Sequence, residues 1–470
     1  MSTTAKEYVT GLIARARAAQ EKIEFADQKS IDDIVGRIAR AGTTEAFAKQ
    51  IAELAVKESR MGRVDSKYGK MITKVKGTYR DLKNEKTVGI IEKDEKKGLV
   101  KFAKPVGVVG ALIPVTNCEA TPFCKALSAI KTRNAIIMAP HPRAAQTGKL
   151  AADRMRNVLA RHGWPEDLVI VMEEISVEGS QELMAQCDLI LATGGPGMVK
   201  AAYSSGKPAL GVGAGNAVTI VDDTVDLDDV ADKIMRSKTF DWATSCSTEN
   251  SCLAQDVIYD DFKSALERAG AYLVPSEEKD QLQKALWPDG VHLNRDIVAQ
   301  HPSKIAEIAG IDLPEGRTFF VVEESGIGKD YPFTGEKLSV VMALYKWSDF
   351  DRAIGMVDDI TGFSGAGHSC GIHTTDEAKA LKLAERVRIS RIMVNQPQCL
   401  ANSGAWTNGM PMTLSLGCGT WGNNSTSDNI DWSKLLNTTW VSWPIPSTLP
   451  TDEDLFSGDI LSEDWDTPTG

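Results

Sequence analysis

Short apolar runs rich in β-branched residues alternate with amphipathic segments over residues 105–223. The runs VGVVGALIPVT, AIIMAP, DLVIVMEE and LILATGG predict strands, and RAAQTGKLAADRMRNVLARHG and VEGSQELMAQ predict the helices between them. Strands that alternate with helices form βαβ units around a parallel sheet. We therefore expect residues 1–223 to form a doubly wound α/β domain of the nucleotide-binding (Rossmann) type.

A second alternating region begins near Thr224. DLDDVADKIMRSKTF and DDFKSALERAGAYL have helical spacing, whereas SCLAQDVIY, RTFFVVEE, LSVVMALYKW and RIMVNQP are strand-like. This pattern predicts a second α/β domain over residues 224–420.

Two strand-like segments lie outside these domains. Residues 87–105, TVGIIEKDEKKGLVKFAKP, have apolar arms around a charged turn and predict a hairpin, which is either an ordinary surface hairpin or one that pairs with another subunit. NTTWVSW, near residue 440, predicts a late strand within a C-terminal segment 421–470. Because exposed strand edges need covering, both segments favour a homodimer or homotetramer.

The N-terminal segment MSTTAKEYVTGLIARARAAQEKIEF places Val9, Leu12, Ala16 and Ile23 near helical spacing. This pattern predicts an amphipathic helix that packs on the body, with docking to a partner as the alternative. It is not typical of a secretory leader.

Composition narrows the class of protein. The net charge of −11 argues against nucleic acid as a partner, and seven acids without a base in residues 447–470 predict a solvated acidic tail. No apolar run approaches the roughly 20 residues that cross a bilayer, so we expect no membrane association. The eight cysteines include no CxxC pair, which indicates free thiols and a cytoplasmic location. No metal-binding motif is present.

One cysteine differs from the others in its surroundings. Cys246 follows a predicted helix into a loop with Ser245, Ser247 and Thr248, whereas most cysteines of such a chain are small buried apolar residues. A nucleophilic thiol needs access and a stabilised thiolate, and a polar loop before a strand can supply both. From the residues alone, both a catalytic and a structural interpretation remain open.

The sequence around this cysteine, KTFDWATSCSTENS, resembles the nucleophile motif of the aldehyde dehydrogenase superfamily, specifically its CoA-acylating branch. The resemblance covers about residues 5 to 440. It rests on six further blocks in one order: KPVGVVGALIPVTN, AIKTRNAIIMAPHPRA, LATGGPGMVKAAYSSGKPALGVGAGNAV, GEKLSVVMALY, GAGHSCGIHT and SLGCGTWGNNSTSDN.

The resemblance implies roles for individual residues. Cys246 would attack the aldehyde carbon, and Asn117 would donate to the resulting oxyanion together with the Cys246 N–H group. Glu336 would hold the nicotinamide ribose. His368 would line the acyl site or assist thiol exchange, with a structural role as the alternative.

The branch is indicated by an absent residue. Hydrolytic relatives activate water with a glutamate in the segment that corresponds to residues 210–216 here, LGVGAGN, which contains no acid. Because a thiol is a better nucleophile than water and needs less help from a base, this favours CoA as the second substrate and acyl-CoA as the product.

The resemblance also predicts an NAD(P) site. Hydrolytic relatives place an acid after the strand AIIMAP to bind the adenosine ribose, whereas this chain has Pro140, His141 and Arg143 there. Arg143 could pair with the 2′-phosphate of NADP, which slightly favours NADP over NAD. The other residues assigned to the cofactor are glycines that allow a close backbone approach: Gly194, Gly195, Gly197 and Gly213.

The C-terminal third resembles acylating sulfoacetaldehyde dehydrogenases more than acetaldehyde enzymes, chiefly in NGMPMTLSLGCGTW. We therefore expect sulfoacetaldehyde as substrate and sulfoacetyl-CoA as product, with CoA-dependent oxidation of succinate semialdehyde or acetaldehyde as alternatives. A sulfonate needs a cation or several donors. The candidates for its site are Thr244, Ser245, Ser247 and Arg391.

Overall fold

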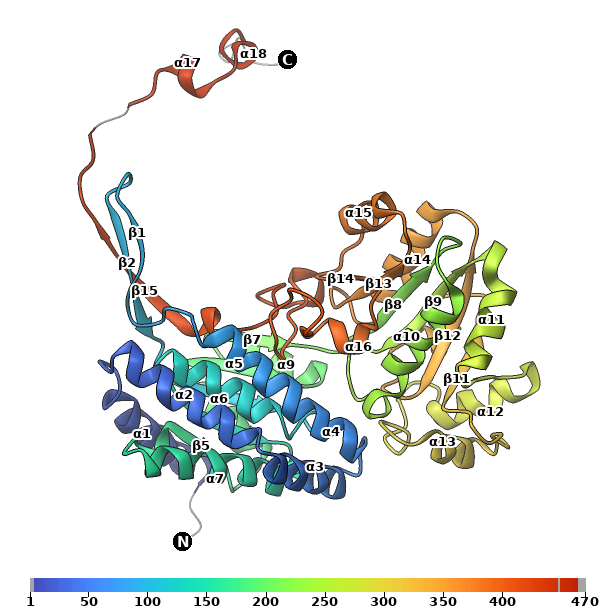
Figure 1. Ribbon diagram of the computed structural model, residues 1–470, viewed down its shortest axis with the longest axis horizontal. Coiled ribbons are helices and arrows are strands. Elements are labelled where there is room, and N and C mark those ends of the chain that lie inside the picture. Colours follow the sequence, from blue (N-terminus) through green and yellow to red (C-terminus); the bar gives the residue numbers. More distant parts are fainter. Residues whose placement is uncertain (1–3, 447–448, 464–470) are drawn as a thin grey trace.

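The protein has two lobes, and a parallel sheet forms the centre of each (Figure 1), as the alternating pattern predicts. The computed structural model describes residues 4–446 and 449–463. The first sheet has five strands in the order β5-β4-β3-β6-β7, and the second has seven in the order β10-β11-β12-β9-β8-β13-β14. The strands of the first sheet are β3 (Val108–Ile113), β4 (Ala135–Pro140), β5 (Val169–Val171), β6 (Leu189–Thr193) and β7 (Ala209–Val212).

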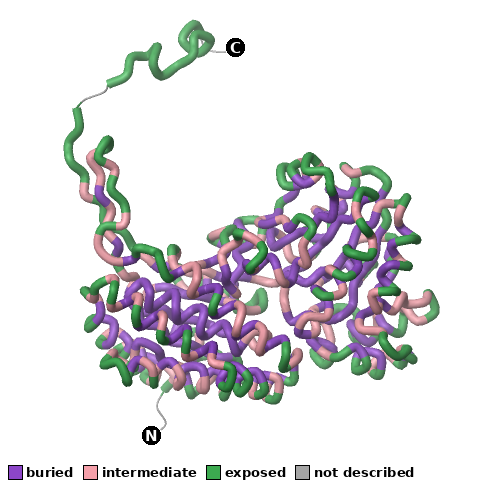
Figure 2. The backbone as a smooth tube through the Cα atoms, viewed as in Figure 1, coloured by how far each residue is buried: buried purple, intermediate pink, exposed green. Residues whose placement is uncertain are grey.

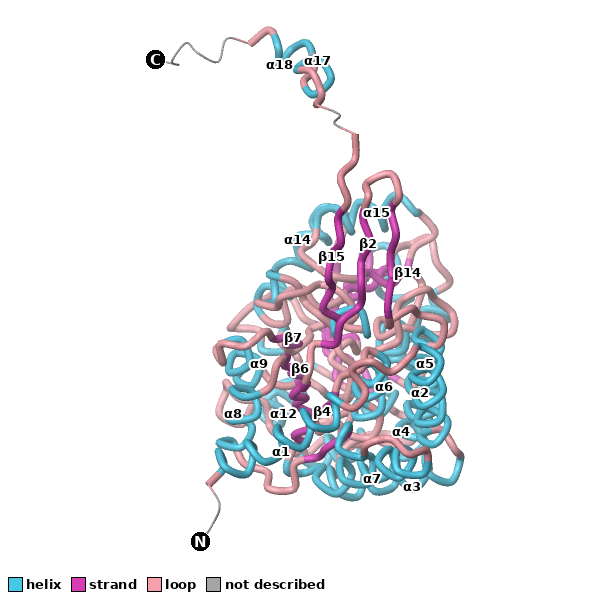
Figure 3. Tube along the Cα trace, turned by 90° about the vertical axis from the view of Figure 1, so that its left-hand side faces the viewer, coloured by secondary structure: helices cyan, strands magenta, loops and turns pink. Residues whose placement is uncertain are grey.

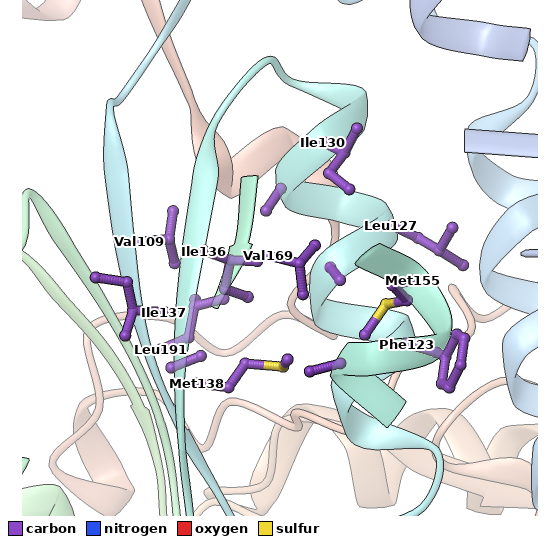
Figure 4. Packing of buried hydrophobic residues seen from close by; sticks show 14 of the residues in the cluster. Val109, Phe123, Leu127, Ile130, Ile136, Ile137, Met138, Met155, Val169 and Leu191 are labelled. Atoms are coloured by element: carbon purple, nitrogen blue, oxygen red, sulfur yellow. The ribbon is translucent and has the colours of Figure 1, made fainter. Parts of the chain in front are cut away.

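Helices cover both faces of the first sheet. Figure 4 shows strand residues such as Val109 and Ile136 facing apolar side chains of the covering helices, including Leu127 and Met155. These strands are apolar at consecutive positions because a parallel sheet between helices is buried on both faces. The helices of this lobe after β3 are α6 (Thr121–Lys131), α7 (Ala145–Arg161), α8 (Val177–Gln186) and α9 (Pro196–Tyr203).

The second sheet has its own apolar core. Its strands are β8 (Ala217–Val221), β9 (Glu249–Gln255), β10 (Ala271–Leu273), β11 (Phe319–Glu323), β12 (Val341–Trp347), β13 (Cys370–His373) and β14 (Ile392–Val394). Its helices are α10 (Leu227–Thr239), α11 (Tyr259–Arg268), α12 (Ser276–Leu286), α13 (Pro302–Ala309), α14 (Phe350–Phe363), α15 (Glu377–Arg386) and α16 (Gln398–Ala401).

The structure moves the boundary between the two units. Residues 217–221, which we expected to end the first unit at residue 223, form β8 and pair with β9 and β13. The chain therefore passes to the second sheet through residues 213–216. Periodicity could not locate this crossing because β7 and β8 are both apolar and only four residues separate them.

Five helical segments precede the first sheet: α1 (Ala5–Glu21), α2 (Gln28–Gly42), α3 (Glu45–Ser59), α4 (Val64–Lys70) and α5 (Lys76–Leu82). The first is the predicted N-terminal helix, and its residues Val9, Leu12 and Ala16 are buried in the core of the first lobe. A π-helical turn, η1 (Met71–Val75), joins α4 to α5. Figure 2 shows these helices buried along their inner side and exposed along their outer side.

The predicted hairpin and late strand form one three-stranded arm. Strand β2 (Leu99–Pro105) pairs antiparallel with β1 (Gly89–Asp94) on one side and with β15 (Leu436–Ser442) on the other. Figures 1 and 3 show that the arm projects from the first lobe. The pairing of the hairpin with a distant strand of its own chain was not predicted.

Beyond the arm, the described part of the acidic segment forms two short helices, α17 (Asp452–Leu455) and α18 (Gly458–Leu461), whose residues are exposed. Residues 447–448 and 464–470 of the predicted tail lie outside the described residues. Within the described part of the chain, no helix is both long enough and apolar enough to cross a membrane.

Candidate active site

The candidate site residues come from opposite edges of the two sheets. In the first sheet, Asn117, His141 and Gly194 follow β3, β4 and β6, so they lie at the carboxyl edge, where ligands of such sheets bind. In the second sheet, Cys246 and His368 precede β9 and β13, so they lie at the amino edge. Both strands pair with β8, which brings the cysteine and the histidine to neighbouring positions.

The thiol of Cys246 contacts the imidazole of His368. Sγ lies 3.0 Å from His368 Nε2, and His368 Nδ1 lies 2.8 Å from the Ser369 hydroxyl oxygen. When Nδ1–H donates to Ser369, Nε2 carries the lone pair that faces the thiol. The pair can therefore move a proton from sulfur to nitrogen.

Both groups of this pair are uncharged at neutral pH in the free protein. Burial raises the pKa of the Cys246 thiol well above its usual range, and the nearby Glu336 adds to this effect. Burial, together with the charge of Arg391, lowers the pKa of His368 to about 3. His368 is therefore a neutral proton acceptor and not the cationic half of an ion pair.

The acid-free segment 210–216 lies against Cys246. A Cβ atom added at Gly215 would approach the Cys246 carbonyl oxygen to 2.1 Å, so only glycine fits there. The Gly215 N–H group donates to Glu336 Oε1 at 3.2 Å. Burial raises the pKa of Glu336 to about 8.

A cavity of about 290 Å³ opens beside the thiol. Of the predicted polar residues, Thr244 and Ser245 line it, whereas Ser247 is buried and does not. The single hydroxyl proton of Thr244 is donated to Asp241 Oδ2 at 2.8 Å, and the Ser245 and Ser247 hydroxyls bond to one another at 2.9 Å. The cavity is lined by Gly69, Lys70, Thr73, Lys74, Asn117, Phe240, Thr244, Ser245, Cys246, Cys399, Leu400, Ser403, Gly404, Ala405, Trp406, Thr407, Met412, Leu414 and Leu416.

Four buried charged groups support this cavity: Lys67 and Lys70 of α4, Glu119 after β3, and Asp241. The ion pairs Lys67–Asp241, Lys67–Glu119, Lys70–Asp241 and Lys70–Glu119 measure 3.2, 3.6, 2.5 and 3.1 Å. Although burial alone would raise it, the two ammonium groups hold the pKa of Asp241 below its ordinary value. The charges balance, which makes their burial tolerable.

The cluster reaches both predicted catalytic elements. Lys70 Nζ donates to Asn117 Oδ1 at 2.7 Å. Because the ammonium can only donate, it fixes the oxygen of the amide and leaves the nitrogen on the other side. Asp241 stands in the turn η4 (Phe240–Ala243), where Asp241, Trp242 and Ala243 have positive φ angles of 50°, 50° and 62°. This turn leads directly to Cys246.

Arg391 does not line the cavity. Its guanidinium group donates to the carbonyl oxygens of His368, Gly417 and Ser427 at 2.7, 2.6 and 2.8 Å. Arg391 thus ties the histidine strand to the C-terminal loops, and its role in binding the substrate stays a prediction.

Apart from Glu336, which precedes β12 of the second sheet, the residues assigned to the cofactor lie along the carboxyl edge of the first sheet. Gly195 and Gly197 are exposed, a Cβ atom at either one or at Gly213 would meet no atom within 4 Å, and no side chain caps α9. The free N–H groups at this helix start fit a pyrophosphate. Gly194 precedes this helix start, as Pro140 precedes the loop of His141 and Arg143.

A carboxylate that the sequence did not reveal lies near the end of β4. Glu58 of α3 accepts hydrogen bonds from the backbone N–H groups of Gln146 and Thr147, at 2.8 and 2.9 Å, and thus caps α7. Arg143 and His141 are exposed, and the Arg143 guanidinium donates to the carbonyl oxygen of Ser59.

Sequence analysis also missed Lys70 and Lys74 of the lining, and Asp241. The spacing of Lys67, Lys70 and Lys74 at i, i+3 and i+7 was a visible signal, but lysines on one helical face are typical of a solvated surface. In the described ranges 4–446 and 449–463, no group of three or more His, Cys, Asp or Glu residues is placed to hold a metal ion.

Two parallel sheets, with a thiol and an imidazole in contact at the amino edge of the second one, indicate an α/β enzyme with a candidate cysteine nucleophile. Residues 1–283 match the model of the aldehyde dehydrogenase family. The chain belongs to this family.

Individual relatives resemble the chain over nearly its whole length. It is 44% identical to the sulfoacetaldehyde dehydrogenase of Acholeplasma sp, over 97% of this chain and 94% of that protein. It is 42% identical to the sulfoacetaldehyde dehydrogenase (acylating) of Cupriavidus necator, over 97% and 93%. The crystal structure of an acetylating aldehyde dehydrogenase from Geobacillus thermoglucosidasius superimposes with a TM-score of 0.91 at 37% identity, over 95% of this chain and 98% of that one.

The buried charge cluster predicts a large effect of Asp241→Asn on stability. Removing this carboxylate leaves two buried ammonium groups with one partner, which typically costs about 3–5 kcal/mol in the free energy of unfolding. Urea unfolding, monitored by circular dichroism, measures this loss in the free energy of unfolding. Asp228→Asn is the matched control, because Asp228 pairs with exposed Arg268 at 2.6 Å, and such pairs contribute less than about 1 kcal/mol. Equal losses in the two variants would show that the buried cluster stabilises the protein no more than an exposed ion pair does.

The pKa shifts of Cys246 and His368 predict how alkylation of the thiol depends on pH. Because the thiol pKa lies above its usual range and the imidazole is neutral above about pH 3, the thiolate fraction of the free protein is small at pH 7 and grows with pH. Iodoacetamide should therefore modify Cys246 at a rate that rises continuously from pH 6 to pH 9, as measured by mass spectrometry. A plateau between pH 6 and pH 8 would instead indicate a preformed thiolate–imidazolium pair.

Proposed function

We propose that the protein is a CoA-acylating, NAD(P)-dependent aldehyde dehydrogenase that converts sulfoacetaldehyde, CoA and NAD(P)⁺ reversibly to sulfoacetyl-CoA and NAD(P)H. The observation that carries the proposal is the pairing of Cys246 with His368 at 3.0 Å beside a segment, residues 210–216, that holds no acid to activate water. The near full-length similarity to acylating enzymes supports the same activity.

Cys246 is the nucleophile of this proposal. Its Sγ attacks the aldehyde carbon while the thiol proton passes to His368 Nε2. The product is a thiohemiacetal whose oxygen carries the negative charge. The neutral imidazole accepts this proton because burial keeps it unprotonated beforehand. The proton leaves to solvent before the second half of the reaction.

The thiohemiacetal oxyanion needs donors that are already in place. Asn117 lines the cavity, and Lys70 holds its amide oxygen, so the amide nitrogen is the group that can donate. We assign the second donor to the backbone N–H of Cys246. Lys70 is in this proposal a positioning residue.

Loss of hydride from the thiohemiacetal carbon to the nicotinamide cofactor would leave a thioester on Cys246, and a thiol resolves this thioester. His368 Nε2 accepts the proton of the CoA thiol, whose sulfur attacks the acyl carbon and displaces Cys246. Acyl-CoA leaves, and Cys246 is reprotonated. Water competes poorly because no carboxylate stands in residues 210–216 to deprotonate it.

Bound NAD(P)⁺ supplies the hydride acceptor. Gly194, Gly195 and Gly197 would receive its pyrophosphate at the start of α9. The resemblance implies that Glu336 would hold the nicotinamide ribose. We retain the slight preference for NADP because Arg143 is exposed beside the end of β4, whereas the nearby Glu58 carboxylate is occupied by the N–H groups of α7. A cytoplasmic, reducing location agrees with eight free cysteines.

The proposed activity predicts turnover that depends strictly on CoA. With sulfoacetaldehyde and either NAD⁺ or NADP⁺, repeated NAD(P)H formation should require CoA, and without CoA a single equivalent should accompany a thioester on Cys246. Asn117→Ala should slow single-turnover hydride transfer roughly 100- to 1,000-fold through loss of an oxyanion donor. The matched control Cys252→Ala changes a buried cysteine of β9 and should retain most activity.

Absorbance at 340 nm and intact-protein mass spectrometry measure these outcomes. Rapid multiple turnover without CoA would contradict the acylating assignment. Equal kcat/KM values for sulfoacetaldehyde and acetaldehyde would contradict the substrate.

We further propose that subunits associate through the arm as homodimers or homotetramers. Its strands β1 and β15 each have an outer edge that pairs with no other strand among the described residues. Trp440 on β15 and Trp443 just after it are both about half exposed.

Light scattering at micromolar concentration should give two or four times the mass of one chain. Trp440→Ser with Trp443→Ser should lower that multiple, whereas Trp421→Ser, an exposed tryptophan of the C-terminal loops, should not. A single-chain mass for the unaltered protein would refute the proposal.

A further inference from the structure

Two buried ammonium groups line the cavity beside Cys246, and they differ in their partners. Lys70 Nζ donates to Asn117 Oδ1 and Asp241 Oδ2 at 2.7 and 2.5 Å and lies 3.1 Å from Glu119 Oε1. The two carboxylates, Asp241 and Glu119, balance its charge.

Lys74 stands in the π turn η1 and has only neutral partners. Its Nζ donates to the backbone carbonyl oxygens of Ser403 and Gly404 at 3.3 and 2.5 Å. In the described part of the chain, no carboxylate lies within 4.0 Å of this ammonium. Lys74 therefore keeps one proton and an uncompensated positive charge in the lining of the cavity.

We propose that Lys74 is the counter-ion for the anionic end of the aldehyde and that it selects anionic short-chain aldehydes over uncharged ones. This inference rests on the proposed function and specifies the substrate class of that site. A sulfonate or a carboxylate that enters the cavity supplies both the missing acceptor and the missing charge.

The environment of Lys74 agrees with this role. Burial lowers its pKa to about 8, which is the expected mark of an ammonium without a carboxylate partner. An uncharged aldehyde in the cavity would leave the third N–H group unpaired and away from water, which disfavours that substrate.

The other predicted candidates are less suited to hold an anion. The Thr244 hydroxyl proton is already donated to Asp241, and Arg391 does not line the cavity. Ser245 shares its hydroxyl with Ser247. Lys74 is the lining cation among the described residues whose charge no carboxylate neutralises.

Substrate preference tests the inference. The ratio of kcat/KM for sulfoacetaldehyde to that for propionaldehyde should fall roughly 10- to 100-fold in Lys74→Met, the loss expected for a hydrogen bond between charged groups. Lys74→Arg should restore part of the ratio. Succinate semialdehyde should follow sulfoacetaldehyde if the site reads negative charge, and should behave like propionaldehyde if it requires a sulfonate.

Lys125→Met is a matched control. Lys125 is also buried, donates to two backbone carbonyl oxygens, those of Leu112 and Leu191 at 3.0 Å, and has a pKa lowered to about 7 by burial. It does not line the cavity of Cys246. Its substitution should leave the ratio within about twofold of the unaltered enzyme. An unchanged ratio in Lys74→Met, or an equal change in both variants, would overturn the inference.

A binding measurement separates this inference from the proposed function. Ethanesulfonate, which cannot react, should protect Cys246 from iodoacetamide, and Lys74→Met should weaken its apparent affinity at least tenfold, with circular dichroism as the check on folding. Protection that depends on Lys74 in a protein that does not oxidise sulfoacetaldehyde would support the anion site and defeat the proposed reaction. Turnover of sulfoacetaldehyde together with protection that does not depend on Lys74 would support the proposed reaction and defeat the anion site.

Discussion

The active centre depends on a buried, electrically neutral cluster of two lysines and two carboxylates. Its lysines belong to α4, Glu119 to the loop after β3, and Asp241 to the turn before Cys246. These three segments are far apart in the sequence and come from both lobes. Removing any member would leave a net charge buried away from water, so the cluster holds helix, loop and turn in one arrangement. The positions of Asn117 and Cys246 follow from it.

The pair of Cys246 and His368 shows how burial controls reactivity. A thiol with a raised pKa and an imidazole with a lowered one are both neutral, so the free protein carries little thiolate. In the proposed mechanism, proton transfer between them becomes favourable as the thiohemiacetal forms and its oxygen takes the charge. The site thereby keeps its cysteine weakly reactive toward adventitious electrophiles and oxidants.

Much of the fold was predictable because parallel strands between helices are apolar at successive positions, as in AIIMAP and LILATGG. Cys246, Asn117 and His368 were predicted from their motifs. The place where they meet could not be predicted, because ligands of such sheets are expected at carboxyl edges and Cys246 lies at an amino edge. Buried lysines escaped detection because long-range ion pairs, and not local pattern, decide whether a lysine can be buried. The contacts of Arg391 could not be predicted for a related reason: its acceptors are backbone carbonyls, which the sequence does not reveal.

The π turn Met71–Val75 separates two duties along one helical stretch. Lys67 and Lys70 precede it and belong to the buried charge cluster, whereas Lys74 lies within it and lines the cavity. A π turn contains about one residue more than an α turn, and each residue of a helix rotates its successors by about 100°. Loss of one codon here would therefore turn a different side chain toward the cavity without disturbing the lysines before it. Evolution could in this way exchange one acyl pocket for another in a single step while the chemistry stays intact.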